Sequence, residues 1–411
     1  MKNNVDALTL NIFRKLNMVK IRGAAMAILL GFSMSATASA QTITPLYGAS
    51  LGMYYGGVVS QVNSATVPGF VVTAACSPNL SLEMEVWRDT GSSLVETGSY
   101  NAGSSTCDGP IALATLFNTS SEGYTTVVTA TLSGGNVLTL AAWQVGPDGS
   151  IVPLGTPAVA GGDVNAFDLT AIGAASGPGF SMVVTSAVLY SNGANVRQLT
   201  TWNVPANGNI TQLHSSGPSS SYCGTAIAHL NATQAVTADT LCPSGDLEVT
   251  AWAIDSAGHV TQKGVVSAGY AFGAVMAPYF QLSTPGVITG SVTESDDLEF
   301  ITWGVSSTGE VTRNASLNKG TTTTPPTITY IPGTTLTFAD VLGGNDALDG
   351  MVFEQPGSSI EEIADYHTSW QYGPQGAAPV SSNRVVTLSI NGNECESGAC
   401  PLELEVWAYA D

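Results

Sequence analysis

Apolar and polar residues alternate in six short segments of the chain, and each segment ends in a tryptophan. The segments are LEMEVW, LTLAAW, RQLTTW, LEVTAW, LEFITW and LELEVW, which end at Trp87, Trp143, Trp202, Trp252, Trp303 and Trp407. Such alternation predicts a half-buried β-strand. Successive tryptophans are 56, 59, 50 and 51 residues apart up to Trp303, and Trp407 follows after 104 residues. The spacing indicates an internal repeat of about fifty residues.

Further features recur around each tryptophan segment. It is preceded by an apolar segment with a Val-Thr or Ile-Thr pair, and that segment is preceded by another apolar one. The pairs are Val72-Thr73, Val128-Thr129, Val184-Thr185, Val236-Thr237, Ile288-Thr289 and Val386-Thr387. A turn glycine follows four of the tryptophans by six residues, at Gly149, Gly208, Gly258 and Gly309. The repeat is thus four short antiparallel strands, here named A to D, which predict the blade of a β-propeller.

The two ends of the chain predict how the ring closes. Only four residues follow Trp407, so the last repeat has no strand D of its own. The segment QTITPL, which begins at Gln41, aligns with GNITQL, which begins at Gly208. We expect the N-terminal segment to supply the missing outer strand, because closure removes the edges that an open sheet would expose.

The number of blades depends on the long interval before Trp407. Residues 321–383 lack a Val-Thr pair and a turn glycine in register. The sequence therefore predicts an all-β, six-bladed propeller whose sixth blade carries an insertion at about 334–376. The alternative is seven blades, with a degenerate seventh repeat around Trp370.

The first 40 residues have the pattern of a secretory signal peptide. Lys15, Lys20 and Arg22 precede an apolar run at 24–32, and Ala-Ser-Ala at 38–40 offers a cleavage site. The apolar run is too short to span a bilayer. We expect a secreted or periplasmic protein whose residues 41–411 form a single propeller domain.

Charge restricts the partners. The chain has 11 basic and 31 acidic residues, and without residues 1–40 its net charge falls from −20 to −24. So few basic residues exclude nucleic acid as a partner. No later segment predicts membrane insertion, and the acid excess favours neutral or cationic partners over anionic surfaces.

Six cysteines in an exported chain predict disulfides. The local pairings are Cys76 with Cys107, Cys223 with Cys242, and Cys395 with Cys400. All six are expected on one face of the ring, where the B to C loops and the D to A connections lie. Zinc is not expected, because no Cys-x-x-Cys is present.

The expected insertion holds the candidate binding residues Tyr366, His367 and Trp370. Ser359 followed by Glu362 is a capping-box pattern that predicts a short helix over residues 360–366. If the protein is an enzyme, Asp365 and His367 are its candidate acid and base. Within LGGNDALDG, Asp346 and Asp349 are weak candidates for Ca²⁺, and no other cofactor is predicted.

Other motifs are interpreted as structural. Asp89-Thr90-Gly91-Ser92 resembles the motif of an aspartic protease, with Asp255 as a possible second carboxylate, but both fit C to D turns. His229, in a strand A, is expected beside a central channel lined by Ala, Leu and Thr. The serine-hydrolase, zinc-protease and nucleotide-binding motifs are absent.

The segments LEVTAWAIDSAGHVTQKG and LTLAAWQVGPDGSIVPLG resemble the Trp-centred blades of secreted bacterial β-propeller proteins without an assigned activity. The resemblance implies a propeller fold and leaves the function open. The favoured hypothesis is a non-enzymatic binding or scaffold module that recognises an extracellular protein or glycan on one face. The alternatives are a hydrolase or lyase that acts on an extracellular polymer, and a structural surface or matrix protein.

Overall fold

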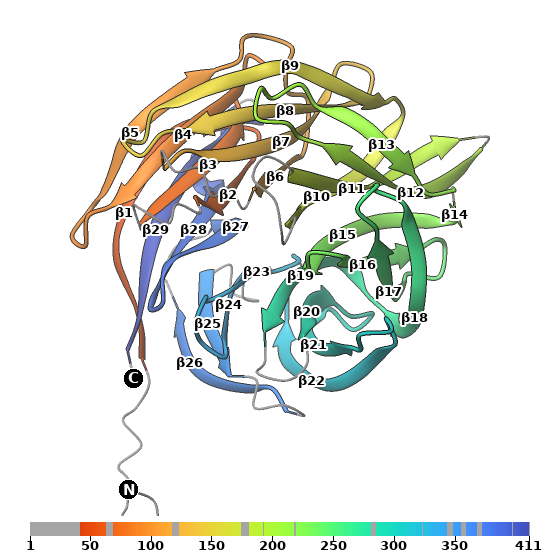
Figure 1. Ribbon diagram of the computed structural model, residues 1–411. Coiled ribbons are helices and arrows are strands. Elements are labelled where there is room, and N and C mark those ends of the chain that lie inside the picture. The colour runs from red at the N-terminus through yellow and green to blue at the C-terminus, as the bar shows by residue number, and fades with distance from the viewer. Residues whose placement is uncertain are drawn as a thin grey trace, which may run out of the picture. The chain divides into compact units, whose positions relative to one another are not determined.

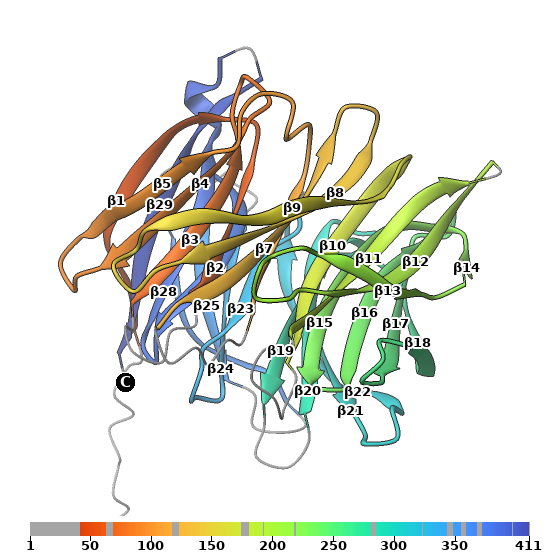
Figure 2. The same ribbon diagram turned by 45° about the horizontal axis from the view of Figure 1, so that its top comes forward.

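The computed structural model describes residues 42–410, apart from 63–68, 117–122, 174–180, 192, 218, 281–284, 323, 343–347, 355–358, 368–371 and 397. The predicted signal peptide lies outside the described residues. Residues 42–410 form one compact unit of seven antiparallel sheets, the blades of a β-propeller (Figures 1 and 2). Of the described residues, only Gly392–Glu394 form a helical turn, η1, and none forms a helix long and apolar enough to cross a membrane.

The strands of each blade, from innermost strand A to outermost strand D, are as follows. Blade 1 is β2 (Gly57–Gln61), β3 (Phe70–Cys76), β4 (Leu82–Asp89) and β5 (Leu94–Asn101). Blade 2 is β6 (Ile111–Thr115), β7 (Thr125–Ser133), β8 (Val137–Val145) and β9 (Ile151–Gly161). Blade 3 is β10 (Val164–Gly173), β11 (Ser181–Ser191), β12 (Ala194–Asn203) and β13 (Thr211–Ser215), with the short β14 (Ser219–Ser220) also paired to β12. Blade 4 is β15 (Tyr222–Asn231), β16 (Gln234–Leu241), β17 (Asp246–Ile254) and β18 (Val260–Tyr270). Blade 5 is β19 (Phe272–Phe280), β20 (Pro285–Val292), β21 (Asp297–Val305) and β22 (Val311–Thr321). Blade 6 is β23 (Thr327–Tyr330), β24 (Leu336–Leu342), β25 (Leu348–Glu354) and β26 (Glu361–His367). Blade 7 is β27 (Tyr372–Ser381), β28 (Arg384–Asn391), β29 (Cys400–Ala410) and β1 (Thr42–Tyr54).

The ring closes as the sequence predicts. The innermost strand of each blade contacts that of the next, and β27 of blade 7 contacts β2 of blade 1. The N-terminal strand β1 pairs antiparallel with β29, so that Thr42 lies opposite Ala410 and Tyr54 lies opposite Cys400. Blade 7 is therefore built from both ends of the chain.

The ring has seven blades, so the main prediction of six is wrong and the alternative of seven is confirmed. Residues 334–376 are not an insertion, because they contain β24 to β26 of blade 6 and the start of β27. The helix expected over residues 360–366 is also wrong. This segment is the outer strand β26, which pairs with β25.

The repeated tryptophan and threonine form one hydrogen bond that blade 6 lacks. In the other six blades the indole Nε1 donates to the Oγ1 of the threonine on strand B, at distances from 2.9 to 3.2 Å. In blade 6 Phe353 occupies the tryptophan position, next to the same bulge between strands C and D, and Ala339 occupies the threonine position. Phenylalanine has no side-chain N–H and alanine has no hydroxyl, so both partners are lost together and blade 6 lacks the repeated Trp and Thr pattern.

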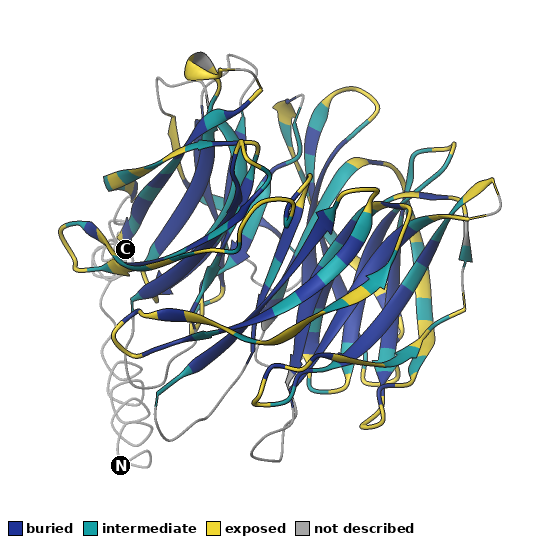
Figure 3. Ribbon diagram, turned by 90° about the horizontal axis from the view of Figure 1, so that it is seen from above, coloured by how far each residue is buried: buried dark blue, intermediate teal, exposed yellow. Residues whose placement is uncertain are grey.

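The tryptophans also fill the spaces between blades. Each of the seven apolar clusters joins two neighbouring blades, and six of them contain the tryptophan of the following blade. The seventh contains Phe353, whose ring centroid lies 4.6 Å from that of Phe300 in blade 5. Buried positions follow the strands, and exposed positions gather at the loops and outer strands (Figure 3). Burial on both faces of each blade explains why only 10% of the residues are charged.

Replacing Thr289 with valine is expected to lower the free energy of unfolding by about 1–3 kcal/mol, because the buried indole N–H of Trp303 loses its acceptor. The Nε1 to Oγ1 distance is 3.0 Å, and both residues are fully buried. The matched control is Thr302→Val in the same blade, because the buried Thr302 hydroxyl has no hydrogen-bond partner among the described residues. Urea unfolding of both variants measures the difference. Equal losses would contradict the role of the indole bond.

The loops divide between two faces of the ring. We call the side with the B to C loops and D to A connections the BC/DA face, and the opposite side the AB/CD face.

The predicted disulfide pairings are present and lie on the BC/DA face. They are Cys76–Cys107, Cys223–Cys242 and Cys395–Cys400. The first ties the end of strand B in blade 1 to the connection that enters blade 2.

Candidate functional site

Two adjacent outer strands of blade 6 bring an imidazole between two carboxylates. His367 ends β26 and lies opposite Asp349 of β25 in the strand register. The His367 Nδ1 is 2.6 Å from Oδ1 of Asp349, and its Nε2 is 3.3 Å from Oδ2 of Asp365. We call these three residues the His367 cluster. The structure thus brings together Asp365 and His367, the two residues of the enzyme hypothesis.

The carboxylates favour the charged imidazole. The hydrogen bond with Asp349 raises the pKa of His367, partial burial opposes the change, and the negative charges of Asp349 and Asp365 reinforce it. A protonated imidazole can donate from both nitrogens, which satisfies both carboxylates. Nδ1 is held by Asp349, and Nε2 lies 3.3 Å from Asp365, which competes with a substrate for that nitrogen.

A small pocket lies beside the His367 cluster on the BC/DA face, between blades 5 and 6. Its volume is about 220 Å³, and its lining includes Asp349, His367 and Lys319 of β22. The Lys319 Nζ is 2.5 Å from Oε2 of Glu362, so the lysine is paired with an acid of the neighbouring blade. The pocket is therefore at the outer strands and separate from the central channel.

The remaining candidates have different places. The ring of Tyr366 packs edge-on against Trp407, with 5.7 Å between ring centroids, and the residue is partly exposed. Trp370 and Asp346 lie outside the described residues. Asp349, the other weak Ca²⁺ candidate, is already bonded to His367. Among the residues that the structure describes, no group of three or more His, Cys, Asp or Glu is arranged to hold a metal ion.

Replacing Asp349 with asparagine is expected to lower the pKa of His367 toward its ordinary value of 6.5. The pKa of His367 is raised in the folded state. The hydrogen bond between Asp349 and the protonated imidazole therefore stabilises the fold fully below the pKa of about 6.5 that His367 has in the unfolded chain. This stabilisation is lost as the pH rises through the pKa of His367 in the folded chain. NMR titration of the imidazole measures the change. In the control Asp365→Asn, the more distant carboxylate is removed, and the decrease should be smaller. An unchanged pKa in the Asp349 variant would contradict the assignment.

The central channel is lined mainly by alanine, leucine and threonine, as the sequence predicts. All seven innermost strands border a cavity of about 230 Å³, which is lined by Val59, Ser60, Gln61, Leu113, Ala114, Thr115, Leu169, Thr170, Ala171, His229, Pro278, Thr329, Ala377, Ala378 and Pro379. Burial lowers the pKa of His229, which favours the neutral imidazole. This lining includes no carboxylate.

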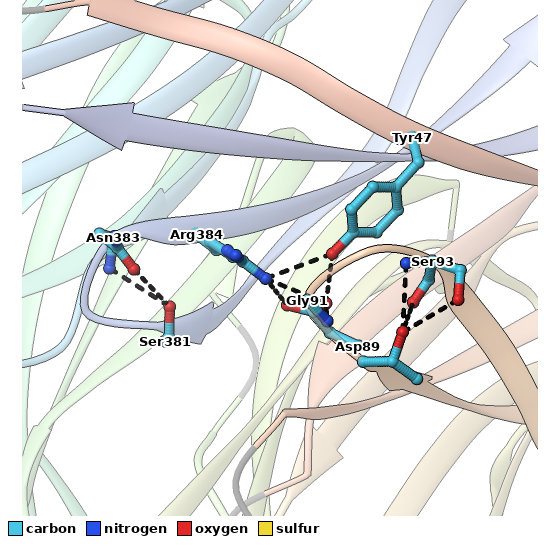
Figure 4. A network of polar contacts seen from close by, with 8 residues as sticks. Tyr47, Asp89, Gly91, Ser93, Ser381, Asn383 and Arg384 are labelled. Atoms are coloured by element: carbon cyan, nitrogen blue, oxygen red, sulfur yellow. Dashed lines mark hydrogen bonds and ion pairs between the residues drawn. The ribbon is translucent and has the colours of Figure 1, made fainter.

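The two aspartates of the protease-like motifs do not meet, because Asp89 lies in blade 1 and Asp255 in blade 4. Asp89 instead ties three segments together (Figure 4). Its carboxylate accepts hydrogen bonds from the Tyr47 hydroxyl of β1, from Arg384 of β28 at 3.0 Å, and from the Gly91 N–H at 2.7 Å. Burial raises the pKa of Asp89, but these donors together hold it below its ordinary value. The motif therefore serves ring closure.

Five aromatic side chains are exposed in the described part of the chain, and all five lie on the BC/DA face. They are Tyr55, Tyr190, Tyr270, Phe272 and Tyr366. Each lies in a D to A connection, at the start of a strand A, or near the end of a strand B or D. Of these five, only Tyr366 is a candidate from the sequence. The signal that could have found the others is their position at strand ends, since alternation alone does not separate an exposed aromatic residue from a core one.

Comparisons with known proteins support the fold. No family model matches the chain, and no curated protein is similar in sequence. Similar solved structures include the periplasmic gluconolactonase of Pseudomonas aeruginosa, with a TM-score of 0.51, 13% identity, and coverage of 76% of this chain and 85% of that one. Aleuria aurantia lectin, solved with Fucα1-6GlcNAc, has a TM-score of 0.48, 14% identity, and coverage of 74% and 94%. AofleA of Arthrobotrys oligospora has a TM-score of 0.48, 11% identity, and coverage of 80% and 90%. The similarity to the gluconolactonase, with a TM-score above 0.5, supports the propeller fold, and at 13% identity it does not extend to a function.

Proposed function

We propose that the protein is a non-enzymatic extracellular binding module that docks a partner protein on its BC/DA face. The observation that carries the proposal is that the five exposed aromatic side chains and the three disulfides lie on this same face. Aromatic residues are enriched at protein interfaces and account for a large share of binding energy. Disulfides at the bases of the loops hold such a face in its bound shape and reduce the entropy lost on binding.

The charge of the chain favours a basic partner. The chain from residue 41 onward carries a net charge of −24, and two of these acids, Asp349 and Asp365 of the His367 cluster, lie on the BC/DA face. A basic protein surface would be attracted at long range and would be docked by the aromatic side chains at contact. Disulfides persist in oxidising compartments, which supports a secreted or periplasmic location.

The local chemistry supports binding over catalysis. A hydrolase or lyase with Asp365 and His367 as acid and base needs an imidazole nitrogen directed at substrate. In the His367 cluster both nitrogens are directed at carboxylates. The cluster is better suited to receive a lysine or arginine of a partner, through Asp365, whose side chain is half exposed.

The test compares two double variants that both remove exposed apolar side chains. Phe272→Ser with Tyr190→Ser alters the BC/DA face, and Val159→Ser with Val152→Ser alters the outer strand β9 of blade 2. The biotinylated proteins are cross-linked to the secreted and surface proteins of the source cells, and the captured proteins are quantified by mass spectrometry. We expect one basic protein to be captured by the native chain and the β9 variant, and its affinity for the face variant to fall by about tenfold or more. Equal capture by both variants would refute docking at this face.

A further inference from the structure

A polar groove lies on the AB/CD face, opposite the proposed docking face. It has a volume of about 520 Å³, larger than the His367 pocket and the channel, and within the roughly 300–1,000 Å³ range of ligand sites. Turns of blades 4 and 5 border it. The lining includes Gln234, Asp255, His259, Lys263 and Ser307. Most of the lining side chains are polar or charged, and such a lining is suited to a hydroxyl-rich ligand.

Hydrogen bonds hold one wall of the groove in place. Asp255 Oδ1 accepts the backbone N–H groups of Ala257 and His259 at 2.9 Å each, which fixes the turn between β17 and β18. Its Oδ2 is 2.8 Å from Nδ1 of His259. In the neutral imidazole that contact places the proton on Nδ1 and leaves Nε2 as an acceptor. The His259 ring also stacks on His214 of blade 3, with 3.7 Å between centroids. In its neutral form His259 therefore offers the groove an acceptor for a ligand hydroxyl.

Lys263, near the start of β18, adds a positively charged group to the groove. The chain beyond residue 40 has only six basic residues, which are Arg88, Arg197, Lys263, Arg313, Lys319 and Arg384. Four of them form ion pairs with carboxylates. Lys263 has no carboxylate within ion-pair distance among the described residues, although acids outnumber bases fivefold in this part of the chain. Its ammonium group is therefore available to an anionic group in the groove.

Because the lining contains one lysine and the Asp255 carboxylate, the groove favours a ligand anion with a single negative charge. A group with two negative charges, such as a phosphate monoester, would be repelled by Asp255 with only one cation to compensate. A carboxylate carries one charge and pairs with one ammonium group. The amide of Gln234, which already reaches the Ser307 carbonyl across the groove at 3.4 Å, offers further hydrogen bonds to hydroxyls.

We propose that the groove between blades 4 and 5 binds a saccharide that carries a single carboxylate, that is, one uronic acid unit. Lys263 pairs with the carboxylate, His259 Nε2 accepts a hydrogen bond from a sugar hydroxyl, and Gln234 contacts a neighbouring hydroxyl. The site does not rest on the proposed protein docking, because it lies on the opposite face and shares no residue with it.

The test uses two trisaccharides as probes in isothermal titration calorimetry. The acidic one has two galactose units and one galacturonic acid unit, and the neutral one has three galactose units. The variant is Lys263→Gln. The matched control is Arg88→Gln, which removes the only other basic residue without an ion pair among the described residues and lies in blade 1, where the guanidinium covers the Phe70 ring. We expect the native chain and the Arg88 variant to bind the acidic trisaccharide equally. The Lys263 variant should bind it about tenfold more weakly or worse, and higher salt should weaken native binding.

Three outcomes would overturn the proposal. They are no saturable binding of the acidic trisaccharide to the native chain, equal affinity of the two variants, and equal affinity of the native chain for the neutral trisaccharide. The Phe272 and Tyr190 variant separates the two proposals. If that variant binds the saccharide but no longer captures the partner protein, both proposals are supported. If the native chain shows only one of the two binding activities, the proposal for the missing activity is refuted.

Discussion

Replacing Arg197 with methionine is expected to lower the free energy of unfolding by about 3–5 kcal/mol, because it leaves a buried carboxylate without its counter-ion. Arg197 of blade 3 pairs with Asp239 of blade 4, and the two side chains are 2% and 0% exposed. The guanidinium also lies over the rings of Tyr222 and Trp252, at 4.5 and 4.9 Å from their centroids. One side chain thus holds two blades together through an ion pair and two cation–π contacts.

The pH dependence of this loss has a definite sign. Burial raises the pKa of Asp239, and the guanidinium opposes the increase. Without Arg197 the folded chain holds a proton on Asp239 at a pH where the unfolded chain has released it. The stability deficit should therefore grow as the pH rises from the acidic range to neutrality. Guanidinium chloride unfolding at several pH values measures it.

Two controls isolate the buried pair. The variant Arg313→Met removes an ion pair with Glu299. The two side chains are 40% and 20% exposed, and the free energy of unfolding is expected to fall by about 0–1 kcal/mol. In Arg197→Met combined with Asp239→Leu both charges are removed, and much of the stability should return. Equal losses for the Arg197 and Arg313 variants would contradict the argument from burial.

Deleting residues 42–54 is expected to abolish cooperative unfolding, because blade 7 loses its outer strand. β1 pairs with β29 from end to end and buries Ile43 and Tyr54. Without β1 the edge of β29 and the neighbouring core residues of blades 6 and 7 would face solvent. Circular dichroism during heating, and size-exclusion chromatography, report the loss.

A circular permutant is the matched control for the deletion. Thr42 and Ala410 lie opposite each other at the ends of their strands, so a two-residue Asn-Gly turn can join Ala410 to Thr42. The chain would then start at Tyr55 and end with the β1 residues. We expect this permutant to unfold cooperatively, like the native chain. A folded deletion variant, or a permutant as unstable as the deletion, would show that β1 does not hold the ring closed.

The sequence predicts the blade because the blade repeats a physical contact. Trp303 and Thr289 illustrate it, since a buried indole needs an acceptor on the adjacent strand and the two residues therefore recur at a fixed spacing. Blade 6 lacks this signal because Phe353 and Ala339 are both apolar and belong to the same buried cluster, so neither needs a hydrogen-bond partner. Its capping-box pattern is local and predicts a helix, whereas the strand pairing that decides the structure is not local.

The sites were less predictable than the fold. Asp365 and His367 are two residues apart in one segment, so their proximity could be anticipated. The contact of His367 with Asp349 depends on the register of two strands that were not recognised as a blade. The groove beside Lys263 joins turns of two blades, and a single sequence does not reveal which turns meet across a blade boundary.

The pairing of the first strand with the last also fixes the order of events during folding. Blades 1 to 6 each form from one continuous stretch, and those contacts can develop as the chain is synthesised. Blade 7 has to wait, because β1 is made first and finds its partner only when β29 appears at the other end. Joining segments so distant has a high loop-closure entropy and delays the final step. Until β1 and β29 pair, each has an unpaired edge, which exposes the folding chain to aggregation through these edges.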